Sequence, residues 1–231
     1  AGVFAGALMA ALVGFVVGLP TLRLRGDYLA IATLGMAEII RIVFLNLDIT
    51  NGAAGLSNIP EFTNWMWLFI FTSGTVLIIT NFINSSHGRA CISIREDEIA
   101  ADAMGINITK YKVTAFVIGA FFAGIAGALY ASRFYVLKPD AFGFLKSIDI
   151  LVIVVLGGLG SISGSIIAAI LLAIITSYLQ SFPEIRMVIY SVTLIAIMLF
   201  RPQGLMGSEE LSKSMFKKWG RLLNRKDGGV A

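Results

Sequence analysis

The chain consists largely of long runs of apolar residues that contain no charged side chain. Such runs occupy residues 1–22, 62–86, 113–132, 150–183 and 187–200. A sixth run follows Asp27 and extends to Leu47, and only Glu38 and Arg41 interrupt it. A helix needs about 20 predominantly apolar residues to cross the hydrocarbon core of a membrane. The pattern therefore predicts an all-α, polytopic membrane protein.

The run at residues 150–183 is too long for one straight span, and a glycine-rich segment divides it. This candidate helix break consists of Gly157, Gly158, Gly160 and Ser161. Two spans here make about seven in all, which places 13 basic residues on one side of the membrane and four on the other. A single span would give seven against ten. Since Lys and Arg accumulate in cytoplasmic loops, we predict seven spans, with the amino end outside and the carboxyl-terminal tail inside.

Small residues recur at every fourth position in the first and fourth predicted spans. They are Gly2, Gly6, Ala10, Gly14 and Gly18, and then Ala120, Gly124 and Ala128. Lipid gives helices little hydrophobic reason to associate, so helices that associate in a membrane use small residues to approach closely. We expect both stripes to face protein rather than lipid.

The composition excludes most water-soluble classes. Hydrophobic residues make up 57% of the 231 residues and charged residues only 14%, whereas soluble domains carry roughly 25% charged residues. The net charge of +4 fits basic cytoplasmic loops better than a nucleic-acid surface. We expect no nucleic-acid partner.

The usual parts of a catalytic or metal centre are missing from the sequence. Cys91 and His87 are the single cysteine and histidine, which excludes a disulfide framework and a Cys/His zinc site. No Walker loop for ATP phosphates occurs. The glycines near Gly157 resemble a dinucleotide fingerprint only loosely, because residue 163 is Ser where the third glycine would fall. We therefore predict no catalytic residue, no metal and no cofactor bound by this chain.

Two features inside the predicted spans are candidates for a translocation path. A helix break is tolerated at membrane depth only beside protein or a water-filled cavity, and broken helices in transporters often mark the substrate path. The alternative is a short cytoplasmic turn between two spans. Glu38 and Arg41 lie three residues apart on one helical face. Charges inside a span are costly and usually functional, but this pair also fits a structural role in which each charge neutralises the other.

The loop at residues 87–112 is long and charged, and residues 95–104 have the composition of a short surface helix. Residues 208–231 form a basic tail with apolar residues at helical spacing. This tail is expected to be a helix at the lipid headgroups, with plain disorder as the alternative. We predict a transmembrane domain over 1–207 followed by this cytoplasmic tail.

Distinctive motifs occur along nearly the whole chain. They include Arg25-Gly26-Asp27-Tyr28-Leu29-Ala30-Ile31, Gly52-x-x-Gly55-Leu56-x-x-Ile59-Pro60, Gly88-Arg89-Ala90, Pro139-x-x-Phe142-x-Phe144, Val154-Val155-Leu156-Gly157-Gly158-Leu159-Gly160-Ser161 and Arg201-Pro202-Gln203-Gly204-Leu205. In this order they resemble one family, the permease subunits of ABC importers for branched-chain amino acids. The resemblance implies a bacterial-type inner-membrane complex of two permeases, two cytoplasmic ATPases that bind ATP, and an extracytoplasmic amino-acid-binding protein. Since family members tend to carry further spans before the region matching Ala1, we expect this chain to lack amino-terminal spans.

The resemblance also implies a cytoplasmic coupling helix that docks on the ATPase. The family pattern is Glu-Ala-Ala-x-x-x-Gly, and here Ile99 occupies the glutamate position while Glu98 lies one residue earlier. The ATPase-coupling residues implied are Arg95, Glu96, Glu98, Ala100, Ala101 and Gly105. The alternative is an ordinary solvated loop helix.

The function implied is import of Leu, Ile and Val by alternating access, with ATP hydrolysed on a partner subunit. A related ABC permease for urea or other amino acids would share most of these motifs. A different class, an ion-coupled carrier or a membrane enzyme, would need several polar groups inside the membrane. The sequence offers chiefly Glu38 and Arg41, and it identifies neither the exact substrate nor the sister permease.

Overall fold

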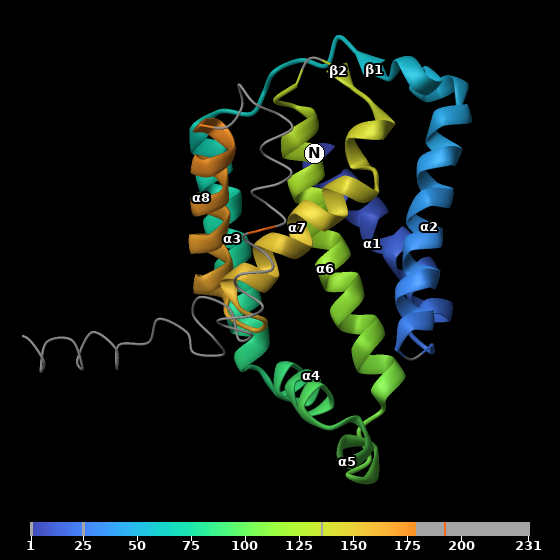
Figure 1. Ribbon diagram of the computed structural model, residues 1–231, viewed down its shortest axis with the longest axis vertical. Helices are drawn as coiled ribbons and strands as arrows, with labels where there is room; N and C mark the ends of the chain where they lie inside the picture. Colours follow the sequence, from blue (N-terminus) through green and yellow to red (C-terminus); the bar gives the residue numbers. More distant parts are fainter. Residues whose placement is uncertain (1, 25, 135, 179–191, 193–231) are drawn as a thin grey trace, which may run out of the picture. The chain divides into compact units, whose positions relative to one another are not determined.

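A computed structural model describes residues 2–24, 26–134, 136–178 and Val192. The chain divides into two compact units, Ala1–Phe144 and Leu145–Ala231. Figure 1 shows that the described residues are mostly helical. The predicted all-α class is confirmed.

Four helices of the first unit are long and apolar enough to cross a membrane: α1 (Gly2–Thr21), α2 (Asp27–Asn46), α3 (Trp65–Asn84) and α6 (Ile108–Ala131). At 1.5 Å per residue, a helix of 20 residues extends about 30 Å, which matches the hydrocarbon core. The four helices fall on four of the apolar runs. Many of their large apolar side chains are exposed, among them Phe4, Ile31 and Phe69, as expected for surfaces that lipid or other helices cover.

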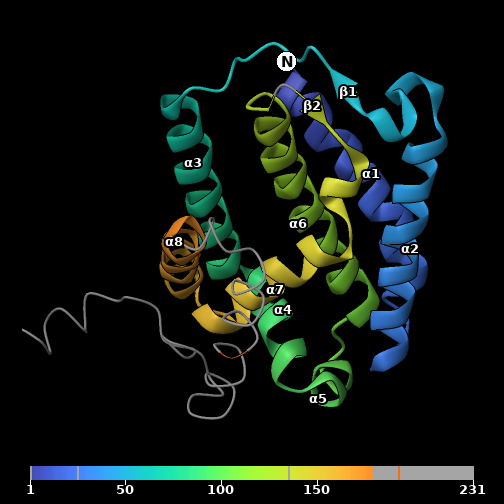
Figure 2. The ribbon, with the colours of Figure 1, turned by 45° about the horizontal axis from the view of Figure 1, so that its top comes forward.

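Short elements connect these helices at two opposite ends of the first unit (Figures 1 and 2). One end holds η1 (Asp48–Thr50), η2 (Gly52–Ala54), β1 (Leu56–Ser57), β2 (Val136–Leu137) and η3 (Pro139–Phe142), with β1 and β2 paired antiparallel. The other end holds α4 (Ser86–Glu96) and α5 (Glu98–Ala103). The chain thus passes back and forth between the two ends. The end with α4 and α5 holds the loop that the predicted topology places inside, and the other end holds the loops that it places outside.

Helices α1 and α6 pack tightly through the two stripes of small residues. A Cβ added at Gly14 would lie 2.6 Å from the Cβ of Ala120, and one added at Gly124 would lie 2.7 Å from the Cα of Ala7. Ala7 is buried together with Ile125 and Leu129 in the apolar core of this unit. The two stripes therefore face each other, which confirms that both face protein.

The second unit contains α7 (Phe144–Gly157) and α8 (Ile162–Tyr178), which pack through Val152, Leu156, Ala168 and Leu172. Helix α7 begins before the apolar run at 150–183, and its 14 residues extend only about 21 Å. Helix α8 has 17 residues. Both are shorter than the roughly 20 residues of a full span, so the count of seven spans stays a prediction. The predicted span at 187–200, apart from Val192, and the tail at 208–231 lie outside the described residues.

The predicted orientation can be tested by labelling single cysteines in intact cells. In a Cys91→Ser background, Ile49→Cys should react with a membrane-impermeant maleimide and Asp102→Cys should not. Ile49 is 87% exposed beside α2, and Asp102 is exposed on α5 at the opposite end. Burial raises the pKa of the native Cys91 thiol, which slows its reaction with a maleimide because the thiolate is the reactive form. The Cys91→Ser change removes this background reaction altogether. Labelling of Asp102→Cys alone would reverse the predicted orientation.

Candidate functional site

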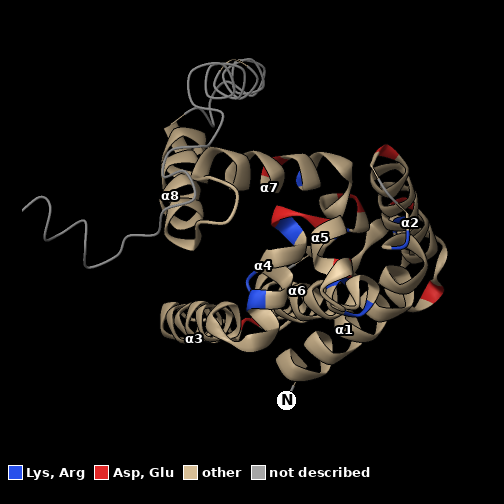
Figure 3. Ribbon diagram, turned by 90° about the horizontal axis from the view of Figure 1, so that it is seen from below, with Lys and Arg blue, Asp and Glu red and all other residues tan. Residues whose placement is uncertain are grey.

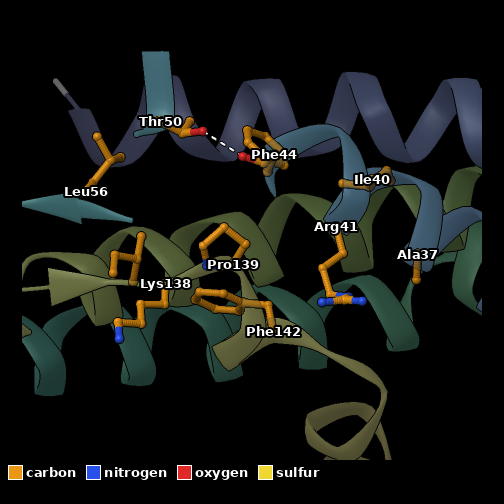
Figure 4. Close-up of a pocket in the computed structure, with 10 residues that line it drawn as sticks. Ala37, Ile40, Arg41, Phe44, Thr50, Leu56, Lys138, Pro139 and Phe142 are labelled. Carbon is orange, nitrogen blue, oxygen red and sulfur yellow. Dashed lines mark hydrogen bonds between the residues drawn. The ribbon is translucent and has the colours of Figure 1, made fainter. Parts of the chain in front are cut away.

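A pocket of about 290 Å³ lies between the carboxyl-terminal half of α2 and the β2–η3 segment. Figure 4 shows side chains of α2 on one wall and those of β2 and η3 on the other. Most of the lining is apolar, with Arg41, Thr50 and Lys138 as the polar members; the apolar members are Ala37, Ile40, Phe44, Leu56, Leu137, Pro139 and Phe142. We call it the outer pocket, because the predicted topology puts this end outside.

Arg41 holds two carboxylates at the edge of the outer pocket. Its Nε donates to both carboxylate oxygens of Glu38, at 3.0 Å each, and its Nη2 also donates to Glu38. Its Nη1 donates to Oδ1 of Asp140 in η3, at 2.6 Å. The pair predicted from the sequence is therefore part of a cluster of three charges. With two carboxylates and one guanidinium, the cluster carries a net charge of −1.

The cluster lies near the end of the span rather than at its centre. Arg41 precedes the last residue of α2, Asn46, by five positions, or about 7.5 Å along the helix. Its side chain is 26% exposed, while that of Asp140 is 63% exposed. The cluster thus fastens the loop at this end to a membrane helix, which a pair within α2 alone would not do.

A side-chain hydrogen bond of Thr50 and the conformation of Gly55 hold the loop after α2 over the pocket. The Thr50 hydroxyl donates to the carbonyl of Phe44, at 2.7 Å, and so anchors η1 to the last turns of α2. Gly55 has a φ of +76°, and a Cβ there would lie 3.0 Å from the Cα of Lys138. Glycine accepts that conformation readily and leaves room for β2. Gly55 therefore allows Leu56 to pair with Leu137, which positions Lys138 and Pro139.

At the opposite end, the loop at 87–112 forms two helices instead of the single helix predicted over 95–104. Helix α4 ends at Glu96, and Asp97 is extended, with φ −153° and ψ 110°. The Asp97 side chain accepts hydrogen bonds from the backbone N–H groups of Ile99 and Ala100, at 2.9 and 3.0 Å. An aspartate in this position caps a new helix rather than continuing the old one. The predicted short helix is therefore present as α5, but it starts later than predicted, at Glu98, and α4 was not predicted.

Helix α5 ends in a Schellman motif built on Gly105. The N–H of Gly105 donates to the carbonyl of Asp102, and that of Ile106 donates to the carbonyl of Ala101, at 2.9 and 3.1 Å. Gly105 has a φ of +80°, the left-handed conformation typical of this motif. A side chain at Gly105 would meet nothing within 4 Å, so only the backbone conformation favours glycine here.

The candidate coupling residues divide into an inner and an outer set. Ala101 is 3% exposed, and the Glu98 carboxylate accepts a hydrogen bond from Lys112 Nζ at 3.0 Å, which ties α5 to α6. Ile99 and Met104 are 81% and 82% exposed. These two residues are not among the predicted coupling residues, but with the exposed Ala100 and Asp102 they form part of the accessible surface of α5 and its C-cap. Arg95 and Glu96 form an exposed ion pair with each other.

Charged residues gather at this end of the first unit. Figure 3, seen from the α4–α5 end, shows basic and acidic positions on and around α4 and α5, while α3 carries none.

The junction between α3 and α4 is close, because a Cβ at Gly88 would lie 2.6 Å from the carbonyl carbon of Ile83. Gly88 therefore lets α4 start directly beneath α3.

In the candidate helix break, Gly157 is the last residue of α7, and Gly158, Gly160 and Ser161 lie in the turn between α7 and α8. Gly158 and Gly160 have φ values of 112° and 99°, and the Ser161 hydroxyl accepts a hydrogen bond from the N–H of Gly164 at 3.1 Å. Ser161 is 2% exposed. The break is therefore a capped turn with two glycines in conformations that other residues avoid. A role in the substrate path stays a prediction.

Sequence reasoning missed Asp140, Thr50 and Lys138. The motif from Pro139 to Phe144 was visible, but nothing in the sequence linked it to α2.

Among the described residues, no three or more His, Cys, Asp or Glu side chains are placed to hold a metal ion.

The chain is similar to several known permease proteins. It is 39% identical to the high-affinity branched-chain amino acid transport system permease protein LivM of Escherichia coli, over 86% of this chain and 55% of that protein. LivH of Escherichia coli, a permease protein of the same kind of system, is 35% identical over 64% of this chain and 48% of that protein. The probable branched-chain amino acid transport permease protein LivM of Methanocaldococcus jannaschii is 26% identical over 91% of this chain and 70% of that protein.

The chain thus spans about half the length of the bacterial relatives it matches. No solved structure matches it. The family described as "Branched-chain amino acid transport system / permease component" matches residues 1–198. A match over so much of the chain shows that it belongs to this family of membrane permeases.

Proposed function

We propose that this chain is a permease subunit of an ATP-driven importer that carries Leu, Ile and Val across a bacterial-type inner membrane into the cytoplasm. The family match over residues 1–198 carries the proposal, together with relatives that are named as branched-chain amino acid permeases. The chain is a multi-pass membrane protein, with four apolar helices of spanning length among the described residues.

The two ends of the first unit suit the two tasks of such a subunit. The outer pocket lies at the end that would receive the amino acid from an extracytoplasmic binding protein. Helices α4 and α5 lie at the other end, where a cytoplasmic ATPase would dock. The chain carries no phosphate-binding loop of its own, so the proposal assigns ATP hydrolysis to a partner and pairs this chain with a second permease.

The proposal also gives α5 a function as the coupling helix. The exposed apolar side chains of Ile99 and Met104 would enter a groove on the ATPase. The ion pair between Glu98 and Lys112 would pass movement of α5 to α6. Arg95, Glu96 and Ala100 would lie at the edge of the contact, while Ala101 and Gly105 shape the helix.

Replacing Gly105 by valine should uncouple the transporter while leaving the permease in the membrane. A β-branched residue at φ +80° is strained, so the end of α5 would shift. We expect substrate-stimulated ATP hydrolysis and uptake to fall together. Gly105→Asn is the matched control, because asparagine tolerates the left-handed conformation. Normal uptake by a well-expressed Gly105→Val variant, or cross-linking that never joins α5 to an ATPase, would remove the coupling role.

Competition for uptake tests the substrate class. Cells that lack their own branched-chain uptake systems would express the intact permease with its ATPase, sister permease and binding protein. Excess Ile and Val should abolish uptake of labelled Leu, and urea should leave it unchanged. Competition by urea, or by polar amino acids as strongly as by Val, would favour a related permease of different specificity.

A further inference from the structure

We propose that the outer pocket is a subsite that receives the branched side chain and the charged head of the transported amino acid. The inference rests on the proposed function and adds to it a place on this chain where substrate binds. It follows from the shape, the charge and the position of the pocket.

The walls of the pocket suit a branched aliphatic side chain. Ile40 and Phe44 from α2 face Pro139 and Phe142 from η3 (Figure 4), and the volume is about 290 Å³. This volume is at the lower limit for small-molecule sites, which are mostly apolar with a few placed polar groups. Burial of aliphatic carbon in such a site is favourable by about 0.8 kcal/mol for each CH₂ group. A small polar solute such as urea would gain nothing from these walls.

The charges around the pocket suit the zwitterionic head of an amino acid. Lys138 lines the pocket and forms no ion pair within the described part of the chain. Its ammonium points away from the α2 wall in Figure 4, but its long, flexible side chain can turn to bring the ammonium to a substrate carboxylate. Asp140, the residue after Pro139, shares one guanidinium with Glu38. That cluster has an excess negative charge, which favours a substrate ammonium group beside Asp140. Positive and negative groups at one apolar site select for a zwitterion over an ion of either sign.

The position of the pocket gives the amino acid a route into it. Its lining residue Arg41 lies about 7.5 Å from the end of α2, and the hydrogen bond from the Thr50 hydroxyl to the Phe44 carbonyl holds the loop over it. On the predicted topology this is the extracytoplasmic end. An amino acid released by a binding protein would therefore meet the pocket before it reaches the deeper part of the membrane.

Filling the pocket tests the assignment. Ala37 lies in its wall, and Ala37→Leu adds bulk without changing charge. We expect the KM for leucine uptake to rise at least about tenfold, the scale of a lost methylene contact. Ala30→Leu, two turns earlier on α2 and outside the pocket, is the matched control and should transport like the wild type. If the wild-type complex transports no branched-chain amino acid, the proposed function fails; if it does and Ala37→Leu matches Ala30→Leu, the subsite alone fails.

Site-directed labelling gives a second test that needs no transport. Leu56 lines the pocket and is 41% exposed, so Leu56→Cys in a Cys91→Ser background should react with a maleimide. In the complete complex, L-leucine should slow the labelling several-fold, while glycine and 2-oxo-4-methylpentanoate, which lack the side chain or the ammonium group, should not. Protection by anionic lipid in place of leucine, or equal protection by the oxo acid, would overturn the assignment.

Discussion

Replacement of Gly124 by leucine is expected to prevent α1 and α6 from packing, and so to remove folded permease from the membrane. A single Cβ at Gly124 would already lie 2.7 Å from both Ala10 and Ala7 and 3.0 Å from the carbonyl oxygen of Gly6. Two of these three neighbours are backbone atoms, which cannot rotate away. Overpacking of this kind costs about 1–3 kcal/mol or more, and in lipid the close fit is itself the main force between helices.

The yield of monodisperse permease in mild detergent and its thermal unfolding temperature check this expectation. Gly127→Leu is the matched control, because Gly127 lies on the same helix and a Cβ there meets nothing within 4 Å. We expect the control to keep its yield. If both variants unfold at the temperature of the wild type, the interface between α1 and α6 is not the one described.

Among changes to the charged cluster, Arg41→Gln should be the most damaging. It leaves Glu38 and Asp140 without their shared guanidinium, and unpaired charges near the membrane are costly. Glu38→Gln is milder because Arg41 still has Asp140. From the sequence alone, each single change of Glu38 or Arg41 should do more harm than the double change. With Asp140 in the cluster, full recovery requires the triple change Glu38→Gln, Arg41→Gln and Asp140→Asn.

The thermal unfolding temperatures of the two single variants, the double variant and the triple variant test this ranking. We expect Arg41→Gln to be lowest, the double variant intermediate and the triple variant nearest to the wild type. A triple variant as unstable as Arg41→Gln would show that charge pairing is not the main structural role of the cluster. Leucine uptake by the triple variant then separates the roles, since a structural cluster predicts recovery and a substrate contact by Asp140 predicts continued loss.

Much of the fold was predictable because it depends on patterns that are local in the sequence. Three of the four long spans follow from uncharged apolar runs of about 20 residues, and α2 follows from a run that only Glu38 and Arg41 interrupt. The packing of α1 against α6 follows from small residues at every fourth position. The start of α7 was missed because Lys146 and Asp149 ended the apolar run. In the structure these two side chains lie three residues apart on α7, with Nζ 3.9 Å from Oδ2, so the helix can include both.

The candidate site was less predictable because it depends on contacts between distant residues. Asp140 and Arg41 are 99 positions apart, and no periodicity relates them. The division of α4 from α5 had a local signal in Asp97, which is a good helix cap, but the charged composition of the segment concealed it. The left-handed conformation of Gly105 had a local signal too, because a glycine that follows a short helix commonly ends it in that conformation.

Uptake into proteoliposomes tests the central claim most directly. The intact permease carrying this chain would be reconstituted with its sister permease, its ATPase and its binding protein, with ATP supplied on the ATPase side and labelled leucine on the other. We predict that leucine accumulates against its gradient, that accumulation needs the binding protein, and that an ATPase variant unable to hydrolyse ATP abolishes it. Leucine uptake of the same rate without ATP, driven instead by an imposed sodium or proton gradient, would contradict the account.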